Sequence, residues 1–294
     1  MQIHCAARDQ AQLGEGALWD SQRAVLWWVD IRSASIHRYH PDTGTAQAQQ
    51  LSCRLTALGL THDGDLIACG DRGFVRVKVG ADLQVSIQEV IAAPVERAGN
   101  RYNDGKVDPQ GHFWAGTMDD AEQGAYGALY RLDPRGAVRC VRRGMSVPNG
   151  PCFLADGTIL SADSARRQIM ALQLNATGEV EREWEFARFT PDQGFPDGMT
   201  VDAENHVWVA FWDGWCVRRL APDGAIVQEV SVPVQRPTCP AFGGPQLSQL
   251  YLTTARVGID PQSLASQPLA GSLLMLEPPV RGLAPARFGR ASDP

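Results

Sequence analysis

The sequence predicts an all-β fold, a six-bladed β-propeller, and three observations lead to this prediction. A short frame of residues recurs six times along the 294-residue chain. The apolar runs are short and alternate with polar residues, which is typical of strands, and no amphipathic helical pattern is found. The copies lie roughly 45 residues apart, which is the length of a four-stranded propeller blade. Six blades of this size use nearly the whole chain.

Each copy of the frame has a head that is often acidic or amidic, then Gly, a short apolar stretch, a turn and an apolar run that often holds Trp. The copies begin at Gly14, Leu58, Asn103, Pro148, Pro196 and Phe242. A second strand pair follows most copies and ends in a Pro/Asp/Gly turn of the kind that closes hairpins, as in residues 36–44, 129–136 and 217–224. We therefore expect residues 1–294 to form one domain. Residues 1–10 are expected to close the last blade, and residues 287–294 to form a frayed tail.

The composition narrows the range of functions. The formal net charge is −6 and there is no basic patch with interleaved aromatic residues, so nucleic acid is not an expected partner. No apolar run approaches the length of a membrane span, and the N-terminus lacks the apolar core of a signal peptide. The seven Cys residues form no Cys-x-x-Cys pattern, and their odd number indicates reduced thiols in a cytoplasmic protein. No strongly apolar exposed stripe is evident, so a monomer is expected.

Polar residues stand at the heads of four copies: Glu15, Asn103 with Asp104, Asn149 and Asp197. The innermost strand of each propeller blade starts near one mouth of the central channel, so these side chains are expected to converge. Carboxylates and carboxamides aimed at one point repel or stay unpaired unless a cation lies between them. The sequence therefore predicts one divalent metal ion. An all-oxygen set favours Ca²⁺ most, with Mg²⁺, Mn²⁺, Zn²⁺ and Fe²⁺ left open.

Six ordered motifs resemble the regucalcin/gluconolactonase (senescence marker protein) family over almost the whole chain. They are residues 13–16, 100–108, 116–118, 148–150, 196–199, and 242–244 with 252–255. The runs 254–258 and 268–271 look most like the bacterial sugar-lactonase branch. The resemblance implies a six-bladed propeller that hydrolyses aldonolactones, with a sugar lactone as its small-molecule partner. It also implies that Glu15, Asn149 and Asp197 bind one divalent metal ion, and that Arg101 and Asn103 contact the substrate.

The resemblance has one departure. Regucalcin-like members carry a substrate-contacting Glu shortly after Gly-Thr-Met, where this chain has Ala121. Asp119, Asp120 or Glu122 can take that place. The sugar therefore stays open among arabinono-, xylono-, galactono- and gluconolactones.

Hydrolysis of a lactone needs a polarised carbonyl group and an activated water molecule. A bound dication can polarise the carbonyl oxygen and lower the pKa of a bound water, and a carboxylate beside that water can take its proton. We assign this base to Asp197 and keep Asp104 as the alternative. Arg101 offers several fixed donors for hydroxyl groups or for a carboxylate product. With Asn103, Asp104 and Lys106 it completes the predicted substrate-binding set. The hypothesis is direct attack of water without a covalent intermediate.

Two other functions stay open from the sequence. The first is a non-catalytic propeller that binds Ca²⁺ or a protein partner, because this fold often serves as an interaction platform. The second is a propeller hydrolase of another ester class, such as phosphotriesters or acyl-homoserine lactones, which needs a wide apolar mouth.

Other prominent residues have structural interpretations. Asp108 and Asp202 occupy equivalent positions of the frame and are expected to cap turns. Trp114 and Trp208 are expected to pack between blades, whereas Trp212 and Trp215, which lie beyond a strand end, can also form the wall of the pocket.

Overall fold

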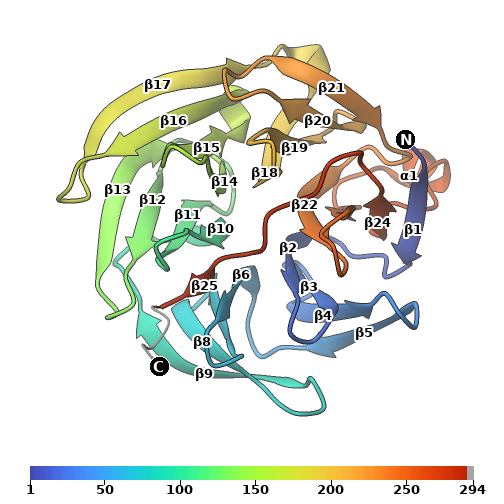
Figure 1. Cartoon of the computed structure of the whole chain (residues 1–294), viewed down its shortest axis with the longest axis horizontal. Coiled ribbons are helices and arrows are strands. Elements are labelled where there is room, and N and C mark those ends of the chain that lie inside the picture. The colour runs from blue at the N-terminus through green and yellow to red at the C-terminus, as the bar shows by residue number, and fades with distance from the viewer. Residues whose placement is uncertain (290–294) are drawn as a thin grey trace.

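The computed structural model describes residues 1–289, and its strands form six sheets around a central channel (Figure 1). This arrangement confirms the predicted six-bladed β-propeller. Blade 1 contains β2 (Gly14–Asp20), β3 (Val25–Asp30), β4 (Ser35–His40) and β5 (Thr45–Gln50). Blade 2 contains β6 (Leu55–Thr61), β7 (Leu66–Gly70), β8 (Gly73–Val79) and β9 (Val85–Ala92). Blade 3 contains β10 (Asn100–Val107), β11 (Phe113–Asp119), β12 (Gly127–Leu132) and β13 (Val138–Met145).

The remaining blades complete the ring. Blade 4 contains β14 (Pro148–Phe153), β15 (Ile159–Asp163), β16 (Gln168–Leu174) and β17 (Val180–Arg188). Blade 5 contains β18 (Phe195–Val201), β19 (Val207–Trp212), β20 (Cys216–Leu220) and β21 (Ile226–Ser231). Blade 6 contains β22 (Pro237–Gly243), β23 (Gln249–Thr254), β24 (Leu273–Leu276) and the N-terminal β1 (Ile3–Ala7). That the whole chain forms one domain stays a prediction.

The two ends of the chain each add a strand to a blade. β1 pairs antiparallel with β24, so the N-terminus closes blade 6 as predicted. β25 (Arg287–Phe288) pairs parallel with the innermost strand of blade 2. The expectation of a tail frayed from Arg287 is therefore wrong for these two residues, because their backbone completes the inner edge of β6. Residues 290–294 of that predicted tail lie outside the described residues.

Burial falls from the channel to the rim of each blade, which explains the sequence pattern. In blade 1 every residue of β2 and β3 is buried, whereas the outermost β5 is largely exposed. Inner strands lie between neighbouring blades and therefore appear in the sequence as nearly continuous apolar runs, while outer strands tolerate polar residues. Trp114 and Trp208 are 1% and 0% exposed, which confirms that they pack within the ring.

The predicted turn caps are confirmed in blades 3 and 5. Asp108 accepts hydrogen bonds from the backbone N–H groups of residues 110 and 112 and from Nε1 of Trp114. Asp202 likewise accepts hydrogen bonds from the backbone N–H groups of residues 204 and 206 and from Nε1 of Trp208. One buried carboxylate thus fixes the turn and the Trp that packs beside it.

Helical structure is confined to short connections among the described residues. One helix, α1 (Pro261–Ala265), lies between β23 and β24, and the Asp260 side chain caps it by accepting from Gln262 and Ser263. Two 3₁₀ turns span Ser164–Arg166 and Pro191–Gln193. A single helical turn is too short to show a periodic pattern in the sequence. Within residues 1–289 no helix has the length and apolar character needed to cross a membrane.

Candidate active site

Bulges in the innermost strands bring the predicted head residues into the channel. The pairing of β2 with β3 shifts register between Glu15 and Leu18, and that of β14 with β15 shifts between Asn149 and Cys152. Blades 3 and 5 have the same irregularity at residues 102–105 and 196–199. A bulge changes the direction of a side chain and often lies beside an active site.

The glycine after each head residue permits this backbone. Gly16 and Gly150 have φ values of +63° and +75°, a region that side chains with a Cβ rarely adopt. At Gly105, which follows Asp104, an added Cβ would lie 2.5 Å from the carbonyl oxygen of Trp114. The acid–Gly and Asn–Gly pairs of the repeated frame therefore mark the positions of these bulges in the sequence.

The channel contains two cavities, one toward each end. The first, which we call the site cavity, has a volume of about 340 Å³ and takes its lining from the beginnings of the inner strands, including Glu15, Asn103, Asn149 and Asp197. The second has a volume of about 130 Å³ and is lined by later residues of the same strands. It is also lined by residues 283–286, a segment that we call the strap, so we call it the strap cavity. In Figure 1 the chain between β24 and β25 crosses the centre of the ring.

Hydrogen bonds fix the carboxamide groups of the site cavity. Asn103 Nδ2 donates to Asn149 Oδ1 at 2.9 Å and to the carbonyl oxygen of Pro148 at 2.9 Å. Asn149 Nδ2 donates at 2.9 Å to Ser164 Oγ, which itself donates to the carbonyl oxygen of Pro196 at 2.5 Å. Because the Ser164 hydroxyl proton is used, its oxygen must accept, and this sets the orientation of the Asn149 amide. Asn149 Oδ1 therefore faces Asn103.

Three buried carboxyl groups lie close enough to interact. Burial, together with the charges of Asp197 and Asp104, raises the pKa of Glu15 well above its ordinary value. Burial and the Asp104 charge likewise raise the pKa of Asp197 well above its ordinary value. Glu15 and Asp197 are 6% and 5% exposed, so water screens these charges weakly. When they are ionised, these carboxyl groups repel one another, and a cation between them would relieve that repulsion.

The donor groups of this cavity fit a hard divalent cation. Glu15 and Asp197 offer carboxylate oxygens and Asn149 offers a carboxamide oxygen, which are the ligands that Ca²⁺, Mg²⁺ and Mn²⁺ prefer. Among residues 1–289, no group of three or more His, Cys, Asp or Glu side chains is arranged to hold a metal ion. The predicted set contains only two residues of those types, so its fit rests on the mixed carboxylate and carboxamide chemistry.

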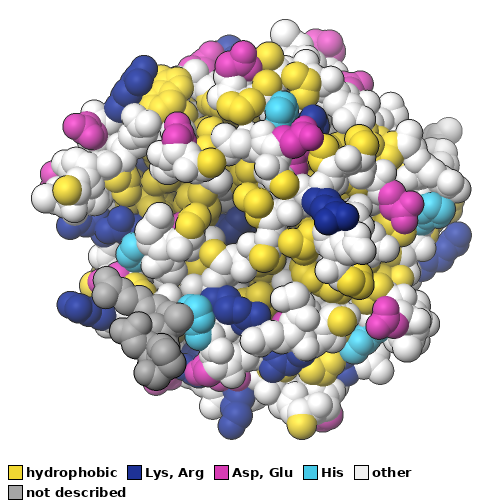
Figure 2. All heavy atoms as spheres, viewed as in Figure 1, with side chains coloured by type: hydrophobic (Ala, Val, Ile, Leu, Met, Phe, Trp, Pro, Cys, Tyr) yellow, Lys and Arg dark blue, Asp and Glu magenta, His cyan; other side chains and the backbone are white. Residues whose placement is uncertain are grey.

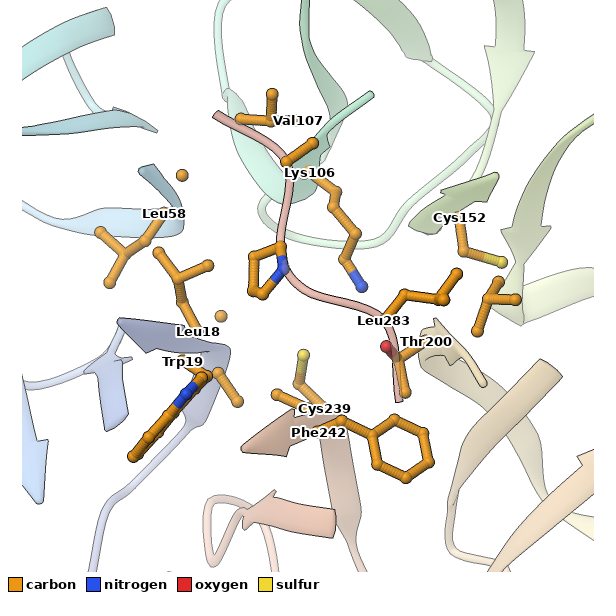
Figure 3. A pocket seen from close by; sticks show the side chains of 18 of the residues that line it. Leu18, Trp19, Leu58, Lys106, Val107, Cys152, Thr200, Cys239, Phe242 and Leu283 are labelled. Carbon is orange, nitrogen blue, oxygen red and sulfur yellow. The ribbon is translucent and has the colours of Figure 1, made fainter. Parts of the chain in front are cut away.

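Asp104 and Lys106 do not line the site cavity. Both line the strap cavity, where the Lys106 ammonium group donates to the carbonyl oxygen of Met199 in blade 5 (Figure 3). Asp104 Oδ1 accepts from the N–H of Gly105 at 2.7 Å and Oδ2 accepts from that of Gly150 at 2.9 Å. The structure therefore separates these two residues from Arg101 and Asn103, with which the sequence grouped them.

Figure 2 views the face that the strap crosses. Hydrophobic side chains lie across the middle of this face. In Figure 3, Leu283 of the strap lies beside the end of the Lys106 side chain, and Cys239 and Phe242 of blade 6 lie farther along the wall of the cavity. The walls of the strap cavity are thus mainly apolar, with Asp104, Lys106 and Thr200 among the few polar side chains.

Arg101 lies where the sequence predicted a substrate contact. Its Nη1 donates at 2.7 Å to Asn103 Oδ1 and its Nε donates at 2.7 Å to Asp120. Burial lowers the pKa of Arg101, with the nearby guanidinium groups of Arg32 and Arg54 acting in the same direction and Asp120 opposing them. The guanidinium group is thus held in one orientation at the wall of the cavity.

The structure distinguishes the three acids that follow Gly-Thr-Met. Glu122 lines the site cavity, whereas Asp119 and Asp120 lie in a separate surface hollow. Asp120 is instead the shared partner of Arg54 and Arg101. Of these acids, only Glu122 is positioned to contact a molecule in the site cavity, from an exposed loop at its mouth.

Several residues of the site cavity were missed by sequence reasoning. Arg32, Ser164 and Arg236 come from turns or strand approaches outside the polar heads of the frame. Trp212 lines the cavity and stacks beneath the Arg236 guanidinium group at 4.5 Å. Trp215, considered together with Trp212, is 43% exposed and does not line it. Ser164 stands directly after the strand paired with the Asn149 strand, and that placement is the only sequence signal for its role.

The fold and the cavity define a class, the six-bladed propellers with an oxygen-rich site in the central channel. Within this class, the chain belongs to the family described as the SMP-30/Gluconolactonase/LRE-like region, which residues 13–256 match. The predicted resemblance to the regucalcin/gluconolactonase family is therefore confirmed.

Three curated relatives cover most of the chain. A pentonolactonase of Haloferax volcanii is 37% identical over 246 residues, or 83% of this chain and 82% of the relative. An L-arabinolactonase of Azospirillum brasilense is 33% identical and covers 94% of this chain and 92% of its own length. The regucalcin of Gallus gallus is 32% identical and covers 98% of both chains.

A solved structure shows the same fold in detail. A calcium-binding regucalcin of Agrobacterium tumefaciens superposes with a TM-score of 0.88 at 29% identity, covering 97% of each chain. Three curated relatives, the pentonolactonase, a 6-deoxy-6-sulfogluconolactonase of Pseudomonas putida and the L-arabinolactonase, are named as lactonases, which agrees with the enzyme class that the sequence predicts.

Proposed function

We propose that the protein is a metal-dependent lactonase that hydrolyses a sugar lactone of the aldonolactone type to the open-chain acid. The observation that carries this proposal is the site cavity, in which two buried carboxyl groups and an oriented carboxamide oxygen face a fixed guanidinium group. The names of the curated relatives support the same reaction class. The volume of about 340 Å³ is near the lower end for small-molecule sites and suits a single sugar ring.

In this proposal Glu15, Asn149 and Asp197 hold one divalent ion, with Ca²⁺ favoured by their ligand type. When bound, the ion would supply Lewis-acid polarisation of the lactone carbonyl and a water molecule of lowered pKa. Arg101 and Asn103 orient the substrate by hydrogen bonds to its hydroxyl groups. Asp197 takes the proton of the attacking water, a role typically worth about 10²–10⁴ in rate.

The assignment of the base to Asp197 in preference to Asp104 is supported by their surroundings. Both Asp104 oxygens already accept backbone N–H groups, and the residue lines the strap cavity. Asp197 lines the site cavity itself. A general base must come within hydrogen-bonding reach of the proton that it removes, which favours Asp197.

The test is acid release from L-arabinono-, D-xylono-, D-galactono- and D-gluconolactone by EDTA-treated protein, with each of Ca²⁺, Mg²⁺, Mn²⁺, Zn²⁺ and Fe²⁺ added back. We expect metal-dependent hydrolysis above the spontaneous rate, lost by at least about 10²-fold in Asp197→Asn. Asp223→Asn, in an exposed turn of the same blade, is the matched control and should keep full activity. Failure of every lactone and metal pair would contradict the proposal, and a trapped acyl-enzyme would contradict direct water attack.

A non-catalytic Ca²⁺-binding propeller is the second candidate. The solved regucalcin is described as calcium-binding, and the donor set of this chain suits that ion. Ca²⁺ binding that depends on Asp197, in a protein without lactonase activity, would favour this second function.

A further inference from the structure

Three arginine side chains line the site cavity, and two of them are neutralised by close carboxylates. Arg101 donates to Asp120 at 2.7 Å, and Arg236 donates to Asp213 at 2.7 Å. The third, Arg32, approaches Asp120 only to 3.7 Å, beyond hydrogen-bonding distance. Within residues 1–289 its guanidinium group forms no hydrogen bond. Among the described residues, Arg32 is therefore the cavity arginine whose guanidinium group has no hydrogen-bonding partner.

The nearest carboxylate has little capacity left for Arg32. Asp120 already accepts from Arg101 on one oxygen, at 2.7 Å, and from Arg54 on the other, at 2.9 Å. Three guanidinium groups thus gather around one carboxylate, and Asp71 offsets only Arg54 among them. Around Asp120 the three guanidinium groups outnumber the two carboxylates, Asp120 and Asp71, and this local charge favours an anion, although Glu122 lines the same mouth.

The backbone beneath Arg32 is fixed. The buried Asp30 side chain accepts the N–H of Arg32 at 3.1 Å and that of Ser33 at 3.2 Å. The same carboxylate accepts from Gln12 and Leu13, in the segment that leads into the Glu15 strand. The Arg32 guanidinium group is therefore carried on a turn that is tied to the strand of a proposed metal ligand.

The exposure of the cavity side chains indicates which end of a bound lactone lies deep in the cavity and which end lies at its mouth. Glu15 and Asp197 are about 5% exposed, whereas the Arg32 side chain is 39% exposed. The reacting carbonyl belongs with the buried carboxylates, and so does the carboxylate that forms from it. Arg32 therefore faces the opposite end of the sugar and not the new acid group.

We propose that Arg32 binds an anionic substituent on the far end of the lactone, so that the preferred substrate is a sugar lactone bearing a carboxylate, sulfonate or phosphate. The inference rests on the proposed function, because it uses the position of the reacting carbonyl. A guanidinium group recognises all three anions through paired N–H donors. A neutral sugar leaves this charge unmatched.

Two lactones that differ at one carbon test the inference. D-Glucono-1,4-lactone ends in a hydroxymethyl group, and D-glucaro-1,4-lactone has a carboxylate at the same position. We expect kcat/KM to favour the glucarolactone by about tenfold or more, the value of one charge-assisted hydrogen bond. Arg32→Ala should reduce that ratio by about the same factor, and Arg32→Lys should retain part of it.

Arg54→Ala is the matched control, because it also removes a guanidinium group from Asp120 but lies outside the site cavity. We expect its ratio to fall less than that of Arg32→Ala, because Arg54→Ala frees one Asp120 oxygen but leaves the Arg32 guanidinium group in the cavity. Equal ratios in the unmodified protein and Arg32→Ala, with both lactones hydrolysed, would overturn the inference and leave the lactonase proposal intact. A ratio lowered equally by Arg54→Ala would also overturn it.

If neither lactone is hydrolysed, the proposed function is wrong, and the anion site is then tested by measuring ligand binding. Calorimetric titration with D-glucarate and D-gluconate then supplies the readout. Tighter binding of glucarate that is lost in Arg32→Ala supports the anion site, and equal binding overturns it.

Discussion

Replacing Asp104 with Asn is expected to change the pH dependence of stability in the metal-free protein. Asp104 is 4% exposed and lines the strap cavity. Burial raises its pKa to about 6, although the Lys106 ammonium group and the N–H groups of Gly105 and Gly150 act against this. The Asn side chain lacks the charge but can accept only one of the two N–H groups that the Asp104 oxygens accept, so near pH 4 the Asn variant should be less stable by about 1–3 kcal/mol.

The sign follows from comparing folded and unfolded chains. The ordinary pKa of the Asp104 carboxyl is 3.8, so between that value and about 6 the unfolded chain has lost the proton that the folded chain keeps. The free energy of unfolding then falls as pH rises through this window. About two pKa units correspond to about 3 kcal/mol lost by pH 7. The Asp104→Asn protein lacks this loss, so between pH 4 and pH 7 its stability relative to the unmodified protein should rise by about 3 kcal/mol.

Urea unfolding in EDTA at pH 4, 5, 6 and 7, followed by the fluorescence of the eight Trp residues, measures this difference. Asp223→Asn serves as the control for a carboxylate in an exposed turn. Adding a divalent cation should reduce this relative gain of the Asn variant, because a nearby positive charge stabilises the ionised acid. Parallel pH curves for the two proteins, or a growing advantage of the unmodified protein with pH, would refute the reasoning.

Three further substitutions test other contacts. Lys106→Met removes the ammonium donor to the carbonyl oxygen of Met199 across the channel. It should lower the free energy of urea unfolding by about 1–3 kcal/mol and leave KM unchanged. A tenfold rise in KM at unchanged stability would show a substrate contact instead. Asn103→Ala removes the donor to Asn149 Oδ1 and should reduce kcat/KM about 10–100-fold, and undiminished activity would contradict this. Gly127→Ala places a Cβ 1.9 Å from the carbonyl oxygen of Thr117 and should cost about 3 kcal/mol in urea unfolding, whereas an unchanged midpoint would argue against this close approach.

The propeller could be predicted from the sequence because each blade is a local unit. Its four strands pair mainly with their sequence neighbours, so the same frame of turns and apolar runs recurs in the chain. The strand that β25 adds to β6 could not be predicted in this way. It is a two-residue pairing between distant segments, and its residues carry no alternating pattern.

The site could be predicted in part. Glu15, Asp104, Asn149 and Asp197 share the position before a glycine of the frame, so the repeat predicted that they approach one another, and, besides burial, the Asp104 charge does raise the pKa values of Glu15 and Asp197. Within β10, side chains alternate between the two cavities, because Arg101 and Asn103 line the site cavity whereas Asp104 and Lys106 line the strap cavity. The sequence grouped these four residues by their density in one segment, and that grouping ignores the alternation.

The turns that carry Arg32 and Arg236 show a second limit. They follow or precede strands at places where the copies of the frame share no residue type, so the repeat does not predict a role for either arginine. The role of each depends on its distance to Asp120 or Asp213, and only the folded ring brings these residues close.

The strap makes the two ends of the channel unequal. Its residues 283–286 lie over one end, on the side where Lys106 reaches across, so small molecules are left with the mouth beside Arg32 and Glu122. Under the proposed function, a lactone and the acid formed from it must then pass through the same opening in opposite directions. An acid that has not yet departed blocks the next lactone, so the product is expected to inhibit by direct competition with its own substrate.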